Sequence, residues 1–129
     1  MSFSYNIGII GGGRIGLPYH LIQMLEQRLK CPLYELTTAI LGMAFKGNSD
    51  DKRDSLSYKL KKLLQLKSKK VFCSDPFVKD DSELVPESDA IANADIIFIG
   101  TPHSCYKKLN IPDGKEIVDI WGILEQGNT

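Results

Sequence analysis

The sequence has no excess of charge of either sign, no long apolar run and no paired cysteines. Sixteen basic residues balance sixteen acidic ones, which argues against nucleic acid as the main partner because phosphate-backbone binding requires a basic excess or stripe. No apolar run approaches the roughly 20 residues needed to cross a bilayer. The N-terminal residues lack a basic segment and a small-residue cleavage site, so neither export nor a membrane partner is expected. The three cysteines show no CxxC spacing and predict neither a disulfide framework nor a zinc site.

The residues that are present suit an ordinary globular domain. A length of 129 residues favours one domain, 1–129, and 43% hydrophobic with 25% charged residues allows a core of the usual kind. A reduced, cytoplasmic setting is the simplest interpretation of the cysteine pattern. One local cluster of lysines is interpreted as a solvated helix face that runs into a turn. Its members are Lys59, Lys61, Lys62, Lys67, Lys69 and Lys70.

Strand patterns alternate with helix patterns along the chain. Short apolar runs predict strands at 5–10, 37–45, 70–74, 96–100 and 116–121. Apolar residues at helical spacing predict helices over 17–30 and 55–66, the second capped by Ser55 or Asp54. The acidic segment 79–88 is predicted to be a loop with a short helical turn. This alternation of near-continuous apolar strands with helices predicts an α/β fold, a three-layer Rossmann-like sandwich with a mostly parallel sheet.

Ligands of such sheets bind beyond the carboxyl ends of the strands. The candidate binding segments are therefore those that follow each predicted strand, namely 11–16, 44–53, 75–78, 100–106 and 119–123.

The first of these segments carries a glycine motif, G-x-G-x-x-G, formed by Gly11, Gly13 and Gly16. In a strand-to-helix turn these glycines permit a tight turn, close approach to a pyrophosphate and close helix packing, which suits a dinucleotide such as NAD. The acidic residue that should hold the ribose is doubtful, because Glu35 precedes a predicted strand instead of ending one. The alternative interpretation is a glycine-rich turn that binds no phosphate.

The segment 39–55 carries a longer motif, with Gly42, Ala44, Phe45 and Lys46 followed by a polar spacer and then by Asp50, Asp51, Arg53, Asp54 and Ser55. It resembles the turn "G-x-A-F-K … D-D-x-R-[ED]-S" of the UDP-glucose/GDP-mannose dehydrogenase family, at the start of its C-terminal, nucleotide-sugar-binding domain. Three further motifs follow in the family's order, at 74–76, 94–103 and 118–124. The resemblance covers about residues 37–124, and residues 9–18 also resemble the start of that family's NAD domain.

The resemblance implies a site for a nucleotide sugar such as a UDP-sugar. Phe45 and Lys46 would contact this ligand, the Lys46 ammonium neutralising diphosphate charge, although Lys46 is alternatively a solvated loop residue. Arg53 would face the cofactor side, or alternatively pair with Asp50 or Asp54. Trp121 stands where the family commonly has an arginine. It can stack on a base or sugar but cannot neutralise phosphate, and alternatively it caps the sheet.

The family's catalytic cysteine lies in a loop "G-G-x-C-x-P-K-D", and the sequence contains no such loop. The resemblance therefore implies binding without complete catalysis. Cys105 is the one alternative thiol with a nearby imidazole, His103, but an i, i+2 pair does not face itself on a helix and no third orienting group is evident.

Three functions remain open: a catalytically incomplete nucleotide-sugar-binding domain, a small NAD(H)-binding module, and an interaction or structural protein with an inherited fold. The family commonly dimerises through a long helix. The predicted helix at 18–30 occupies that place and carries Tyr19 and Met24 outside its core stripe, which favours a homodimer.

Overall fold

The computed structural model describes residues 4–6, 16–51, 55–112 and 114–120. Within them, five strands form one sheet in the order β1-β5-β4-β2-β3, and every neighbouring pair is parallel. The strands are β1 Ser4–Asn6, β2 Thr37–Leu41, β3 Lys70–Ser74, β4 Ile96–Ile99 and β5 Glu116–Asp119. The helices are α1 Gly16–Leu29, α2 Leu56–Lys67 and α3 Glu87–Asn93, with short 3-10 helices η1 Leu33–Glu35 and η2 Ser104–Tyr106.

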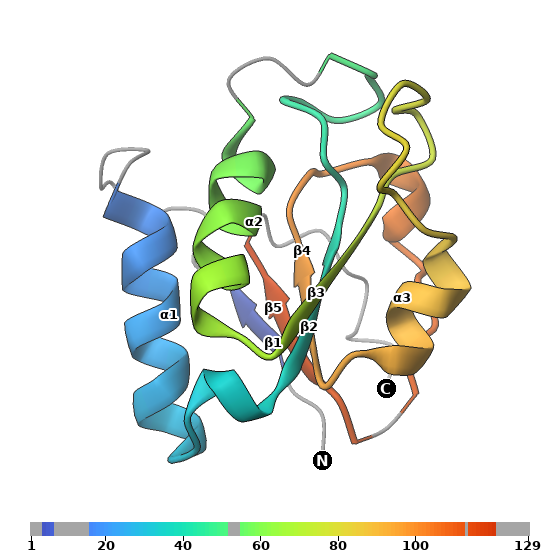
Figure 1. The fold of residues 1–129 in the computed structure, drawn as a ribbon. Helices are drawn as coiled ribbons and strands as arrows, with labels where there is room; N and C mark the ends of the chain where they lie inside the picture. Colours follow the sequence, from blue (N-terminus) through green and yellow to red (C-terminus); the bar gives the residue numbers. More distant parts are fainter. Residues whose placement is uncertain (1–3, 7–15, 52–54, 113, 121–129) are drawn as a thin grey trace.

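The sheet is covered on both faces, with α1 and α2 on one side and α3 on the other (Figure 1). Successive side chains of a strand point to opposite faces. Ile40 of β2 accordingly packs in the core cluster that contains Leu60 and Leu64 of α2, whereas Leu41 packs in the cluster that contains Ala90 of α3. The strands β2 and β4 are buried along nearly their whole length. The predicted three-layer α/β sandwich with a parallel sheet is confirmed.

The helix ends follow from local chemistry. Of the two predicted caps, Ser55 is the N-cap of α2, and its hydroxyl accepts the Ser57 N–H at 3.1 Å. The helix α1 ends before Lys30, which adopts a left-handed φ of 54°, and Pro32 then prevents continuation. Both predicted helices are therefore found within two residues of their expected bounds.

Two predictions along the chain were wrong. The strand β2 stops at Leu41 instead of reaching Phe45, because Gly42 turns the chain at a φ of 95°. Residues 87–93 form the helix α3, where only a short helical turn was predicted within 79–88. The two buried residues of α3, Ala90 and Ile91, are too few to produce a helical apolar pattern. The predicted strand at 5–10 is found as β1, and residues 7–10 lie outside the described part of the chain.

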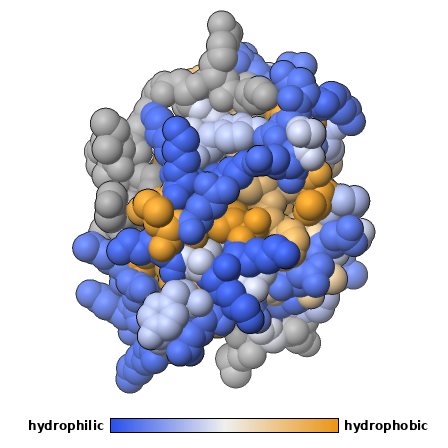
Figure 2. All heavy atoms as spheres, in the orientation of Figure 1, coloured by the Kyte–Doolittle hydropathy of each residue, from blue (hydrophilic) through white to orange (hydrophobic). Residues whose placement is uncertain are grey.

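The edge strand β3 faces the viewer in Figure 1. Figure 2 shows apolar atoms gathered near the middle of this side, with hydrophilic residues around them. Val71 and Phe72 of β3 are half-buried, and the Lys70 ammonium lies 4.9 Å from the centre of the Phe72 ring. Charged residues on an edge strand oppose pairing with another chain.

The predicted solvated lysine face is largely found, since Lys62, Lys67, Lys69 and Lys70 are exposed. Lys61 differs, because it forms an ion pair with Glu83 at 2.6 Å. Among the residues that the structure describes, no helix is long and apolar enough to cross a membrane, and no group of three or more metal-ligating side chains is found.

Candidate functional site

The sheet order creates a switch point between β2 and β4. The chain leaves β2 toward α2 on one face, whereas it leaves β4 toward η2, whose Tyr106 packs on the face of α3. Connections that diverge from the carboxyl ends of neighbouring parallel strands leave a crevice in which ligands of α/β proteins bind. Two of the predicted binding segments, 44–53 and 100–106, begin at this point.

The turns after β2 and β4 are in direct contact, and glycines make the contact possible. A Cβ atom on Gly42 would lie 2.6 Å from the Cβ atom of Thr101, and one on Gly47 would overlap the carbonyl oxygen of Pro102. The Thr101 hydroxyl donates a hydrogen bond to the Ala44 carbonyl at 2.7 Å. The two turns therefore form one unit, and a side chain at Gly42 or Gly47 would collide with the turn after β4.

A buried carboxylate lies at the centre of this unit. The side chain of Asp75, directly after β3, has no exposed surface and accepts five hydrogen bonds. The donors are the backbone N–H groups of Met43 at 2.6 Å, Ala44 at 3.1 Å, Phe77 at 2.7 Å and Val78 at 3.2 Å, and the His103 ring at 2.8 Å. Burial opposes ionisation of Asp75, but the hydrogen bonds from His103, Met43 and Phe77 outweigh it and lower the pKa of this carboxyl.

His103 connects the carboxylate to the far end of the turn. Its side chain is fully buried, and its Nδ1 atom accepts the Asn48 backbone N–H at 2.8 Å. Since Nδ1 is an acceptor, the ring proton lies on Nε2, which donates to the Asp75 Oδ2 atom at 2.8 Å. The Phe77 ring covers the imidazole at a centroid distance of 4.6 Å. Both ring nitrogens are thus engaged inside the protein.

Phe45 and Lys46 lie between these two anchored ends. Both side chains are exposed, Phe45 at 41%, while the Phe45 N–H donates to the Asp51 carbonyl at 2.5 Å. The two residues predicted to contact a ligand are therefore displayed at the carboxyl end of the sheet on a backbone that is held from several sides.

The start of α2 also holds the turn. The Ser57 hydroxyl donates to the Gly42 carbonyl at 2.6 Å, and the Ser55 hydroxyl donates to the Ala44 carbonyl at 3.4 Å. Sequence reasoning did not include Ser57, Asp75 or His103 among the site residues. The signal for Asp75 and His103 was present, since both follow predicted strands within the expected binding segments.

The other predicted site residues are only partly described. Gly16 is the first residue of α1. Gly11, Gly13, Arg53 and Trp121 lie outside the described residues, so their predicted roles and the alternative ion pair of Arg53 stay predictions.

The thiol alternative receives no support from the structure. The pKa of Cys105 is raised, first by partial burial and then by the negative charge of Glu87. His103 is directed to Asp75 and Asn48, and it does not activate the thiol. Cys73 is buried inside β3, as expected of a core residue.

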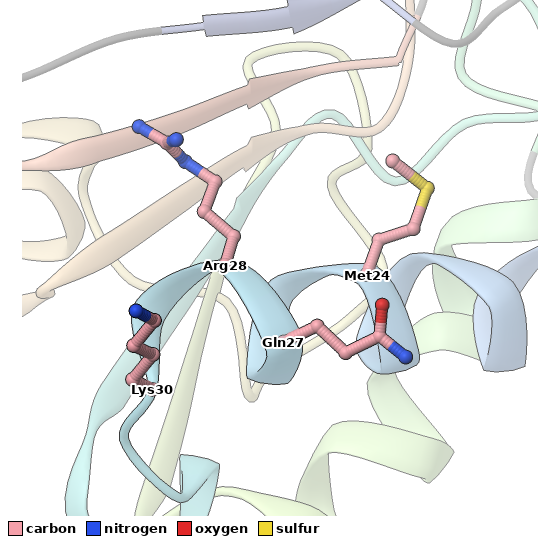
Figure 3. A pocket seen from close by; sticks show the side chains of 4 residues that line it. All are labelled: Met24, Gln27, Arg28 and Lys30. Carbon is pink, nitrogen blue, oxygen red and sulfur yellow. The ribbon is translucent and has the colours of Figure 1, made fainter.

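A shallow depression on α1 lies at the opposite end of the sheet. Figure 3 shows the side chains that line it, Met24, Gln27, Arg28 and Lys30. Arg28 forms an ion pair at 3.0 Å with Glu116, at the first position of β5. The depression is therefore part of the packing of α1 on the amino ends of the strands, away from the switch point.

Comparisons with known proteins give the same relationship as the sequence motifs. Residues 39–126 match the model of the UDP-glucose/GDP-mannose dehydrogenase family, UDP binding domain. A UDP-N-acetyl-D-mannosamine dehydrogenase of Pyrococcus horikoshii is 33% identical over 76 residues, which are 59% of this chain and 18% of that protein. One from Methanococcus vannielii is 30% identical over 103 residues, 78% of this chain and 24% of that protein.

Solved structures agree. A UDP-D-ManNAc dehydrogenase of Pyrococcus horikoshii superposes with a TM-score of 0.74 at 25% identity, over 87% of this chain and 28% of that one. A UDP-glucose dehydrogenase of Pyrobaculum islandicum gives 0.71 at 28% identity, over 83% and 26%. The chain thus spans about a quarter or less of the length of the curated relatives it matches. By the match of residues 39–126, this chain belongs to the UDP-glucose/GDP-mannose dehydrogenase family, in the region of its UDP binding domain.

Proposed function

We propose that this chain binds a nucleotide sugar, a UDP-sugar, at the turn 44–48. The observation that carries the proposal is the geometry of this turn, whose backbone is anchored at both ends while Phe45 and Lys46 are exposed at the switch point. The family match adds support, because the matched region, 39–126, contains the whole turn, all of β4 and the last three residues of β2.

The exposed groups have the chemistry that such a ligand requires. The Lys46 ammonium supplies charge for a diphosphate, and hydrogen bonds to ionised groups are the stronger kind. The Phe45 ring offers an apolar face to a base or sugar. By resemblance, Trp121 would add a second aromatic surface, and Arg53 would face the cofactor side of the site.

A thermal-shift series tests this proposal. Ligand at a 100-fold excess over its Kd stabilises the folded chain by about 2.7 kcal/mol, and we expect this response to UDP and UDP-glucose. The response should disappear in Lys46→Ala, whereas Lys62→Ala, which removes an exposed charge on α2, should keep it. The proposal is contradicted if no UDP compound shifts the melting temperature of the wild-type chain, or if the shift in Lys46→Ala equals that of wild type.

Oxidation of the sugar is not part of the proposed role. The family's cysteine loop is missing from these 129 residues, and Cys105 has a raised pKa. We expect binding without turnover, and NADH formation from a UDP-sugar by the purified chain would contradict this.

NAD is the second ligand that we propose. Gly11 and Gly13 lie in the sequence between β1, which ends at Asn6, and α1, which begins at Gly16. This order supports the proposal, because the motif works between a strand and a helix. When bound, NAD supplies hydride-transfer chemistry. A stabilising response to NAD that is lost in Gly13→Val is the expected result, and a response unchanged by that substitution assigns NAD elsewhere.

A homodimer through α1 stays a proposal. Met24 is half-buried against the core and offers only part of its side chain to a partner. Sedimentation at high micromolar concentration is the test, and a monomer under those conditions contradicts the dimer.

A further inference from the structure

One buried pair, Asp75 and His103, holds both ends of the turn 44–48. Asp75 accepts the Met43 and Ala44 N–H groups where the turn begins, and His103 accepts the Asn48 N–H where it ends. The pair itself is joined by the 2.8 Å hydrogen bond from Nε2 to Oδ2. The two exposed residues of the turn thus lie between contacts to a single hydrogen-bonded unit.

The Asn48 end of the turn has a second connection. Asn48 adopts a φ of 56°, a left-handed conformation that asparagine tolerates better than most residues. Its side-chain oxygen accepts both the N–H and the hydroxyl of Ser104, each at 3.0 Å. Asn48 therefore contacts the segment after β4 twice, through its backbone at His103 and through its side chain at the next residue, Ser104.

We propose that His103 is a positioning residue for nucleotide-sugar binding. Through Nδ1 it fixes the Asn48 end of the turn, so that Phe45 and Lys46 are ordered before a ligand arrives. Its hydrogen bond from Nε2 to Asp75 holds the ring in the tautomer that leaves Nδ1 as an acceptor. The inference rests on the proposed function at this turn. His103 is fully buried and both its nitrogens are occupied, so it acts on the ligand only through the turn.

Ordering the turn in advance affects affinity for a physical reason. A segment that is ordered only on binding spends part of the interaction energy on lost conformational freedom. Gly47 lies against the Pro102 carbonyl. The residue after it, Asn48, donates the backbone hydrogen bond to His103 that fixes this end of the turn. Loss of that anchor is expected to release Lys46 from its placement while leaving the core untouched.

Two substitutions separate the two nitrogens. The side-chain oxygen of His103→Asn lies near the place of Nδ1 and can accept the Asn48 N–H, but this side chain is too short to reach Asp75. The amide nitrogen of His103→Gln reaches the place of Nε2 and can donate to Asp75, but it leaves the Asn48 N–H without an acceptor. Each variant thus removes one of the two hydrogen bonds.

The expected binding results differ between the variants. His103→Gln should weaken UDP-glucose binding about tenfold, the effect of one net hydrogen bond, whereas His103→Asn should stay within about threefold of wild type. Urea unfolding serves as the control for a merely structural role, which would weaken binding in proportion to lost stability in both variants. Equal affinities of the two variants, or a weaker His103→Asn, overturn the proposal.

Two NMR measurements on the ligand-free chain complete the test. The imidazole ¹⁵N spectrum of wild type should show Nε2 protonated and Nδ1 without a proton, and the Asn48 amide should be protected from exchange in wild type and His103→Asn but not in His103→Gln. A proton on Nδ1 refutes the inference without any variant. Failure of wild type to bind UDP-glucose removes the proposed function and the positioning role with it, whereas tight binding that is indifferent to His103→Gln removes only the positioning role.

Discussion

Asp75→Asn is expected to destabilise the fold by about 3 kcal/mol, because it disturbs a fully buried carboxylate that anchors the turns after β2 and β3. The carboxylate accepts five hydrogen bonds through two oxygens. An asparagine that keeps its oxygen toward Met43, Ala44 and His103 turns its NH₂ group toward the Phe77 and Val78 N–H groups. Two buried donors then face a donor, and each unsatisfied group costs about 1–3 kcal/mol.

Urea unfolding followed by tryptophan fluorescence and by circular dichroism measures this change. The midpoint should fall while the slope of the unfolding free energy against urea stays constant, since the surface exposed on unfolding is unchanged. Asp50→Asn is the matched control, because Asp50 is exposed and the substitution removes the same charge. It should change stability by less than about 0.5 kcal/mol. A cost below about 1 kcal/mol for Asp75→Asn would refute the account of the site given by these hydrogen bonds.

Four further outcomes are expected. The pKa of Asp75 is lower in the folded chain than in the unfolded chain. The contribution of this carboxylate to stability is therefore complete above the unfolded pKa of about 3.9 and is lost as pH falls through the folded pKa. The stability difference between wild type and Asp75→Asn, measured by urea unfolding, should shrink below about pH 4. Gly47→Ala should cost about 1–3 kcal/mol and weaken UDP-glucose binding in calorimetry, since the added methyl meets the Pro102 carbonyl; wild-type behaviour would mean that the two turns are not in contact. Tyr106→Phe should be neutral or stabilising in thermal melts, because the buried hydroxyl has no hydrogen-bond partner within the described structure. Leu64→Ala should cost about 2–5 kcal/mol, measured by urea unfolding, because Leu64 is fully buried between α2 and the sheet.

The layers and most elements could be predicted because their causes are local and periodic. The helix pattern of Leu60, Leu63 and Leu64 was visible in the sequence, and these residues are buried as the pattern requires. The apolar runs of β3 and β4 likewise matched the observed strands, β3 residue for residue. The helix α3 was missed because a seven-residue helix that buries Ala90 and Ile91 leaves no repeating pattern.

The end of β2 was misplaced for a reason that lies outside the strand. Met43 and Ala44 read as a continuation of the apolar run, but their N–H groups donate to Asp75 instead of to a neighbouring strand. Gly42 turns the chain, and a carboxylate 31 or 32 residues away in the sequence then accepts the N–H groups that would otherwise face a neighbouring strand. No local propensity carries that information.

The sequence by itself determined the family, the alternation of strands with the helices α1 and α2, and the location of Phe45 and Lys46 just beyond a strand, since motif spacing and hydrophobic period are properties of the linear chain. Only the tertiary structure decided that Asp75 and His103, 28 residues apart, form one hydrogen-bonded pair, and that His103 accepts the N–H of Asn48, 55 residues away. Hydrogen bonds require donor and acceptor within about 3 Å, and the parallel sheet brings its strand ends that close only after it has assembled.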